Sequence, residues 1–412
     1  MSEFLRRVSA QFPADQVRTS AGEGLPRARR YSSKLALVLS GGGARAAYQV
    51  GVLAALAERL PELEFPILTG VSAGAINTIY LAAHPGPLAA AVDGLRAEWH
   101  ALTAERVFRG RSGSLLRSAA GWALSTLLGR RTRPTLVRGI LDTQPLREFL
   151  GATIDVRGIE ANIMAGRLRA AALSATSITS GWSVSFVQGT SDAPTWERAS
   201  RKGVRGPLTL EHVMASAAIP ILFPAVPLAG EFYCDGGVGQ GAPLAPAIHL
   251  GARAVFVIGM KTRWKGQEPV AVATQYPSAA EVAGLLLGTI FQDQLEADAD
   301  RLARINRLLA ALPSTTPPPD GLKPVDLLLL RPRRDLASLA RGHTAALSRS
   351  VRSIVKGMGG QREGAADFLS YVAFESAYTA QLMELGYEDT GAQWSQIEPF
   401  FAKLERRPDE SG

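Results

Sequence analysis

The chain has 412 residues, 46% of them apolar and 20% charged, which is typical of a globular protein and excludes a disordered one. A single cysteine excludes an intrachain disulfide, and no uncharged apolar run of about 18 residues predicts a membrane-spanning helix. The net charge of +8 is carried mainly by arginine, which suits an anionic partner. Because zinc-finger spacing and aromatic RNA-binding strings are missing, we expect no nucleic acid and instead a peripheral contact with a membrane. The N-terminal residues have no apolar core for a signal peptide, so we expect the protein in the cytoplasm or at the inner face of the membrane.

The beginning of the chain predicts a parallel α/β sheet. Residues 1–33 are polar and arginine-rich, and we expect them to form a flexible extension. Residues 34–40 form a short apolar run typical of a buried strand, and a glycine-rich turn follows it and opens a helix that ends near residue 60. A second apolar run at 65–71 leads through another turn into a helix over 75–83. Strand, turn and helix repeated in this way indicate parallel strands joined by helices.

The rest of the chain continues this alternation. We expect a mostly helical stretch over 86–152, a β-hairpin with its turn at 178–181, and a polar loop over 191–206. The later expected elements are a helix over 209–218, a strand over 231–234, a helix over 243–251, a strand over 254–260, a long helix over 279–312, a proline-rich connector over 313–324, a strand over 325–331, and helices over 365–385 and 394–404.

Ser72 lies at the apex of the second turn, in the sequence Gly70-Val71-Ser72-Ala73-Gly74. A sharp strand-to-helix turn lifts a serine hydroxyl clear of the sheet, and the flanking glycines let the two arms pass close together. The helix that begins there directs its N-terminal N–H groups toward the group that the serine attacks. We therefore interpret the turn as a nucleophile elbow.

The first turn, at residues 41–43, leaves backbone N–H groups free to face an anion. A dinucleotide pyrophosphate is one candidate, but Ala46 stands where that fingerprint has its third glycine. The alternative is an oxyanion hole for the intermediate of an acyl transfer, formed by the N–H groups of residues 41–44. Arg45 has two interpretations, as a support for substrate charge or phosphate and as a member of a structural ion pair.

A serine nucleophile needs a base, and the histidines do not suggest one. None of the five lies in a motif-like turn: His84, His100, His212, His249 and His343. Asp235 ends an expected strand and precedes Gly236 and Gly237, which indicates a tight, exposed turn. The pKa of a free aspartate is about 3.9, so burial beside the strand end would have to raise it before Asp235 could act as a base.

In this order the motifs resemble those of the patatin-like phospholipase family. They read Gly41-Gly42-Gly43-Ala44-Arg45, Gly70-Val71-Ser72-Ala73-Gly74 and Asp235-Gly236-Gly237, and the segment Ala215-Ser216-Ala217-Ala218-Ile219-Pro220 resembles the stretch before the family's aspartate. The resemblance covers residues 34–250, and one departure is Ala46, where the family usually has glycine.

The resemblance implies a three-layer α/β/α sandwich with a mainly parallel central sheet and additional C-terminal helices. It also implies hydrolysis of carboxylic ester bonds in lipids, without a metal or a cofactor. Ser72 would be the nucleophile and Asp235 the base that takes its proton. The N–H groups of Gly42, Gly43 and Ala44 would stabilise the oxyanion, and water would release the acyl-enzyme.

The expected catalytic domain spans residues 34–250, and residues 251–412 supply one or two further strands and helices packed on it. An insert at about residues 103–140 carries eight arginines between 106 and 138 and no acidic residue there. Its apolar run, residues 115–129, fits a helix that lies in the membrane interface, and equally a buried helix that covers the sheet.

The function expected from these residues is a serine lipid acyl hydrolase that acts on phospholipids, lysophospholipids or acylglycerols. Three alternatives stay open at this point. They are a Ser–His–Asp esterase completed by His249 or His343, an inactive membrane-binding or interaction protein, and a nucleotide-binding protein.

Overall fold

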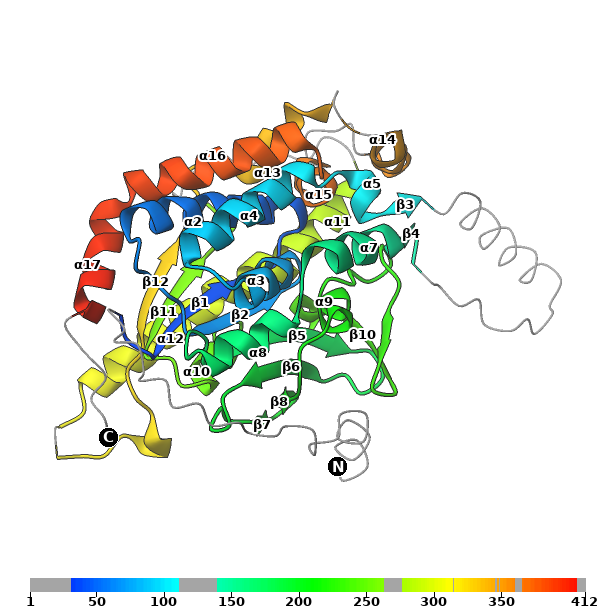
Figure 1. Cartoon of the computed structure of the whole chain (residues 1–412). Helices are drawn as coiled ribbons and strands as arrows, with labels where there is room; N and C mark the ends of the chain where they lie inside the picture. Colours follow the sequence, from blue (N-terminus) through cyan, green and yellow to red (C-terminus); the bar gives the residue numbers. More distant parts are fainter. Residues whose placement is uncertain are drawn as a thin grey trace.

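The fold is organised around one large sheet. The computed structural model describes residues 31–110, 139–262, 276–313, 315–344, 347, 349–359 and 365–405. Within these residues the sheet has ten strands: β1 (Leu35–Leu39), β2 (Ile67–Val71), β5 (Ala170–Ser177), β6 (Ser183–Gly189), β7 (Trp196–Arg198), β8 (Arg201–Arg205), β9 (Val226–Leu228), β10 (Glu231–Asp235), β11 (Ala254–Ile258) and β12 (Asp326–Leu330). Their order is β12-β11-β1-β2-β5-β6-β8-β7, and β10 pairs with β5 and β9 (Figure 1).

The pairing of the strands brings the three sequence motifs to one edge of the sheet. Strands β12, β11, β1, β2 and β5 are parallel, so the turns that follow β1 and β2 lie side by side. Between β2 and β5, Val71 lies opposite Ser174. Strand β10 runs antiparallel to β5 and places Asp235 opposite Ala175. The glycine-rich turn, the elbow and the aspartate therefore meet at the carboxyl ends of the central strands.

Helices cover both faces of the sheet, because side chains along each strand point alternately to the two sides. Along β1, Leu37 enters one core and Val38 the other. The second core is closed by α10 (Ala245–His249) and α12 (Gln294–Ala310). The first core is larger and takes residues from α2 (Ala47–Arg59), α3 (Ala73–Ala83), α4 (Leu88–Ala101), α5 (Ala104–Val107), α7 (Gln144–Thr153), α8 (Arg157–Met164), α9 (Leu210–Ser216), α11 (Ala279–Gly288), α13 (Leu336–Arg341), α14 (Arg349–Gly357), α15 (Ala366–Val372), α16 (Ser376–Ala392) and α17 (Trp394–Glu405).

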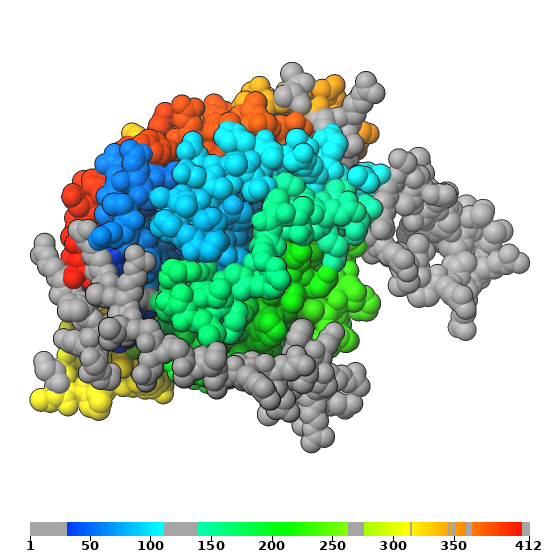
Figure 2. Space-filling view, viewed as in Figure 1, coloured from blue at the N-terminus to red at the C-terminus, as the bar shows by residue number. Residues whose placement is uncertain are grey.

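The C-terminal helices pack directly on the first helices of the chain. Helix α16 lies along α2, where the Tyr48 hydroxyl donates to Asp389 Oδ2 over 3.1 Å. In Figure 2, α16 (orange) lies beside α4 (cyan) and α2 (blue) on the surface of the molecule. The short elements are η2 (Gly43–Ala46), η3 (Gly236–Val238), η4 (Thr289–Asp293), η5 (Pro319–Gly321), and a separate pair of strands, β3 (Arg109–Gly110) and β4 (Leu141–Asp142).

The layered α/β/α architecture with a mainly parallel sheet and C-terminal helices is confirmed. The polar loop expected over 191–206 is wrong, because β7 and β8 extend the sheet beyond β6 there. The long helix expected over 279–312 is divided by η4, a π-helical turn between α11 and α12. Most of the basic insert, residues 111–138, lies outside the described residues. In the part of the chain that the structure describes, no helix combines the length and the apolar character needed to cross a bilayer.

Candidate active site

Ser72 occupies a strained turn between β2 and α3. Its φ of 56° and ψ of −130° are unusual for a residue with a side chain, and such strain is typical of functional positions. Its backbone N–H donates to Ser216 Oγ over 3.0 Å, and that hydroxyl in turn donates to the carbonyl of Ser174 over 2.6 Å. Gly74 lies so close to β1 that a Cβ there would be 2.2 Å from the carbonyl oxygen of Leu39. The elbow is therefore held by Ser216 through a hydrogen bond and by β1 through close packing.

Ser216 is a positioning residue that the sequence does not single out. It is the last residue of α9 and is fully buried. Thr209 and His212 form a capping box at the start of this helix, with the Thr209 N–H donating to His212 Nδ1 over 3.0 Å. The sequence resemblance covers the segment that contains Ser216, but nothing in it indicates which side chain meets the elbow.

The glycine-rich turn lies directly beside the serine. A Cβ added at Gly41 would be 2.9 Å from Ser72 Cβ. No hydrogen bond between described residues uses the N–H groups of Gly42 or Gly43, as expected for the first turn of a helix. Gly43 has a φ of 55°, and a Cβ there would lie 2.2 Å from the carbonyl oxygen of Tyr371. The turn thus offers unused donors next to Ser72, and Ala44 follows as the next residue of η2.

Asp235 is fully buried, which corrects the exposed turn expected for it. Its backbone N–H donates to the carbonyl of Ala218, and its Oδ1 accepts from the Gly237 N–H over 2.9 Å. Its Oδ2 has no hydrogen-bond partner among the described residues. Burial raises the pKa of Asp235 to about 7, although the nearby Ser72 hydroxyl and the Gly237 N–H act to lower it. The Ser72 hydroxyl is near enough to lower this pKa, although no hydrogen bond of normal geometry joins it to the carboxyl.

The histidines make their contacts elsewhere. The His84 Nδ1 accepts from the Gly86 N–H, and His100 is exposed at the end of α4. His249 stacks on Trp196, and His343 Nε2 lies 2.9 Å from Gln381 Oε1. Burial lowers the pKa of His212, in its capping box, to about 4. No histidine contacts Ser72, so the neighbour available as a base is Asp235.

Arg45 does not point toward a substrate phosphate, which corrects one of its two interpretations. It is 2% exposed and donates to side chains of α15, namely Ser370 over 2.7 Å and Asp367 over 2.7 Å. Its guanidinium also lies over the ring of Tyr371, 4.2 Å from the centroid. Its donors are therefore engaged by the C-terminal helices, in agreement with the second interpretation, a structural ion pair.

Phe291, on the π-helical turn η4, covers the site. A Cβ added at Gly41 would be 2.5 Å from its ring, and one added at Gly237 would be 2.8 Å from it. The ring therefore lies between the two turns that flank the serine. Ser72 is 2% exposed and Asp235 0%, so both groups are sealed from solvent. The sequence gives no sign of this cover, since Phe291 fits an ordinary helical pattern.

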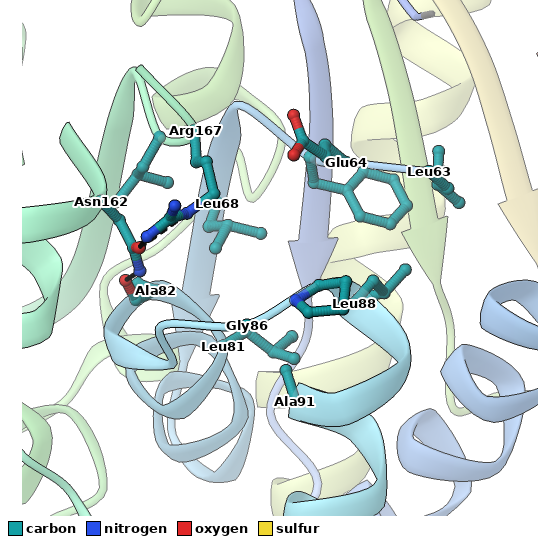
Figure 3. A pocket seen from close by; sticks show the side chains of 13 residues that line it. Leu63, Glu64, Leu68, Leu81, Ala82, Gly86, Leu88, Ala91, Asn162 and Arg167 are labelled. Atoms are coloured by element: carbon teal, nitrogen blue, oxygen red, sulfur yellow. Dashed lines mark hydrogen bonds between the residues drawn. The ribbon is translucent and has the colours of Figure 1, made fainter. Parts of the chain in front are cut away.

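A separate cavity of about 70 Å³ lies near the amino end of β2 (Figure 3). It is lined largely by apolar side chains such as Leu68 and Leu88. Its polar members include Glu64, Asn162 and Arg167, of which Asn162 and Arg167 bond to each other. Ligands of open α/β sheets bind at the carboxyl ends of the strands. This cavity lies at the opposite end of β2 from Ser72 and does not serve it.

The chain is similar to solved structures and to a protein family. Among solved structures, human GIVD cytosolic phospholipase A2 in complex with methyl gamma-linolenyl fluorophosphonate is 14% identical, with a TM-score of 0.42, and the match covers 98% of this chain and 63% of that one. VipD from Legionella pneumophila is also 14% identical, with a TM-score of 0.31, over 89% of this chain and 72% of that one. The chain thus spans about three fifths of the human protein's length, and a search of curated proteins found no match. The family model described as "Patatin-like phospholipase" matches residues 37–248, just over half of the chain. The chain belongs to the patatin-like phospholipase family.

Proposed function

We propose that this protein is a serine lipid acyl hydrolase that cleaves carboxylic esters with Ser72 and Asp235. Membership of the family supports lipid ester hydrolysis as the reaction class. The observation that carries the proposal is a strained serine near a buried carboxyl whose Oδ2 has no hydrogen-bond partner among the described residues. A carboxyl with a pKa of about 7 is well matched to proton transfer near neutral pH.

The proposed reaction uses these groups in turn. Ser72 Oγ attacks the ester carbonyl carbon and gives its proton to Asp235 Oδ2. The negative charge that develops on the carbonyl oxygen is stabilised by the N–H groups of Gly42 and Gly43. The intermediate expels the alcohol, which takes the proton from Asp235 and leaves Ser72 acylated. Water then attacks the acyl group, giving one proton back to Ser72 by way of Asp235, and the fatty acid departs.

The substrate class we propose is phospholipid, lysophospholipid or acylglycerol, with the protein acting at a membrane surface. A Ser–His–Asp triad has less support, because each histidine makes its contacts away from Ser72. An inactive interaction protein has less support too, because it would not explain a strained elbow beside a buried carboxyl.

A fluorophosphonate probe tests the proposal, since it reacts covalently with activated serines. We expect labelling of the full chain, loss of labelling in Ser72→Ala, and retention in Ser180→Ala, an exposed serine in the β5–β6 turn that serves as control. Product analysis with synthetic phosphatidylglycerol, lysophosphatidylcholine and triacylglycerol then identifies the lipid class. Absence of both labelling and product release, with detergent or lipid present, would refute the proposed activity.

A further inference from the structure

Helix α11 carries an exposed apolar stripe beside the cover of the active site. Val282, Leu285 and Leu286 are 47%, 70% and 57% exposed and lie on one side of the helix. The opposite side is buried against α15, where a Cβ on Gly284 would touch Asp367. Helices of soluble proteins normally turn charged or polar side chains to water. An outer face made of large apolar side chains marks a contact surface.

The helix that carries the stripe runs directly into the turn that carries Phe291, the residue that covers the site. Helix α11 ends at Gly288 and passes without a loop into η4, which carries Phe291. π-Helical turns are strained and often occur at functional positions. The cover is held by the Gln292 amide, which donates to the Tyr371 hydroxyl over 2.8 Å, and by an exposed ion pair of Lys261 with Asp293. Helix α11 and Phe291 therefore lie on one continuous helical segment.

Exposed basic side chains near the start of α11 favour an anionic surface, since the acidic Asp367 beside the helix is paired with Arg45. The Ala280 N–H, at the start of α11, donates to the carbonyl of Met358, which directly follows α14. Arg352 and Lys356 are exposed on α14. In Figure 1, α14, α15 and α11 lie together at one end of the molecule, with α5 and β3. Apolar side chains flanked by exposed basic ones are typical of helices that bind anionic lipid surfaces.

We propose that the α11 stripe docks on an anionic lipid bilayer and that docking moves Phe291 away from Ser72 and Asp235. This inference rests on the proposed function and adds its regulation: in solution the dyad is sealed, and the lipid surface that holds the substrate opens it. Neither α11 nor Phe291 lies within the residues that match the family model.

The test measures the rate of Ser72 labelling by a small fluorophosphonate, with and without vesicles. Vesicles of ether-linked phosphatidylglycerol are used, because they supply the surface but no cleavable ester. If the open state holds about 0.1–10% of the molecules in solution, vesicles should accelerate labelling by about tenfold or more. Phe291→Ala should label rapidly without vesicles and gain little from them. Ether-linked phosphatidylcholine vesicles should accelerate the wild type far less.

Two surface variants test the stripe itself. Leu285→Asp with Leu286→Asp should abolish vesicle sedimentation and the acceleration without lowering the melting temperature, since both side chains are exposed. Leu308→Asp is the matched control, because Leu308 is 64% exposed on α12, away from the stripe, and it should behave as wild type.

The outcomes separate this inference from the proposed function. Equal labelling with and without vesicles in the wild type and in Phe291→Ala overturns the docking mechanism while leaving the hydrolase intact. No labelling of either protein under any condition refutes the hydrolase itself. Loss of self-association in the Leu285→Asp, Leu286→Asp variant, with unchanged vesicle binding, assigns the stripe to a second copy of the chain and overturns the lipid assignment.

Discussion

Replacing Asp235 by asparagine separates the catalytic use of this carboxyl from its effect on stability. The amide has nearly the same shape, and its oxygen can still accept from the Gly237 N–H. It cannot take a proton from Ser72, so we expect labelling by the fluorophosphonate to be lost. It also cannot ionise, so the unfavourable burial of a carboxylate disappears and the variant should be more stable than the wild type.

The magnitude follows from the pKa of Asp235, which burial raises from 3.8 to about 7. The folded protein therefore holds this proton more tightly than the unfolded chain does. This tighter proton binding contributes to the free energy of unfolding. The contribution is fully present below about pH 4, declines as the pH rises toward 7, and is absent above it. At about 1.4 kcal/mol per pKa unit, the carboxylate lowers the free energy of unfolding by about 4 kcal/mol at pH 8 and by less than about 2 kcal/mol at pH 5.

The assay is thermal unfolding of wild type and Asp235→Asn in matched buffers. With an unfolding entropy of about 2.1 cal/mol/K per residue, we expect the variant's Tm to lie about 5 °C higher at pH 8 and about 2 °C higher at pH 5. Ser72→Ala is the control, because it loses labelling but keeps the carboxyl and should show no gain that grows with pH. A gain of equal size at both pH values, or none at either, would refute the raised pKa of Asp235.

Three further outcomes are expected. The rate of Ser72 labelling should rise about tenfold between pH 6 and pH 8, because only ionised Asp235 accepts the proton; a rate that is flat across pH 7 contradicts this. Ser216→Ala leaves the buried Ser72 N–H without its acceptor, and should lower kcat more than it raises KM and cost about 1–3 kcal/mol of stability in urea unfolding. His249→Gln and His343→Gln should keep the labelling rate of wild type, whereas loss in either variant would favour a histidine-based triad.

Local patterns in the sequence were sufficient to predict those parts of the structure that neighbouring residues determine. The elbow at Ser72 was predictable because strand, turn and helix follow one another within a few residues. The meeting of the turns after β1 and β2 was predictable because parallel strands end at the same edge of a sheet. The deep burial of Asp235 was not predictable, because the residues that cover it come from α9 and η4, which are distant in the sequence from the Ser72 elbow.

The strands β7 and β8 were missed because they are short and charged. The edge strand β7 carries Glu197 and Arg198, and its neighbour β8 carries Lys202, and these side chains remove the apolar alternation by which strands are recognised. Phe291 was missed because a π-helical turn keeps the periodicity of a helix closely enough to escape notice. The partners of Arg45 were missed because they lie more than 300 residues further along the chain.

The attachment of Arg45 to α15 has a consequence for biosynthesis. The helical turn that carries Arg45 is anchored by side chains that the ribosome adds more than 300 residues later. Until Asp367 and Ser370 have emerged, Arg45 has no counter-charge and that turn lacks its anchor. If Ser72 is the nucleophile, as proposed, a chain that ends before Asp367 should not be labelled by a fluorophosphonate.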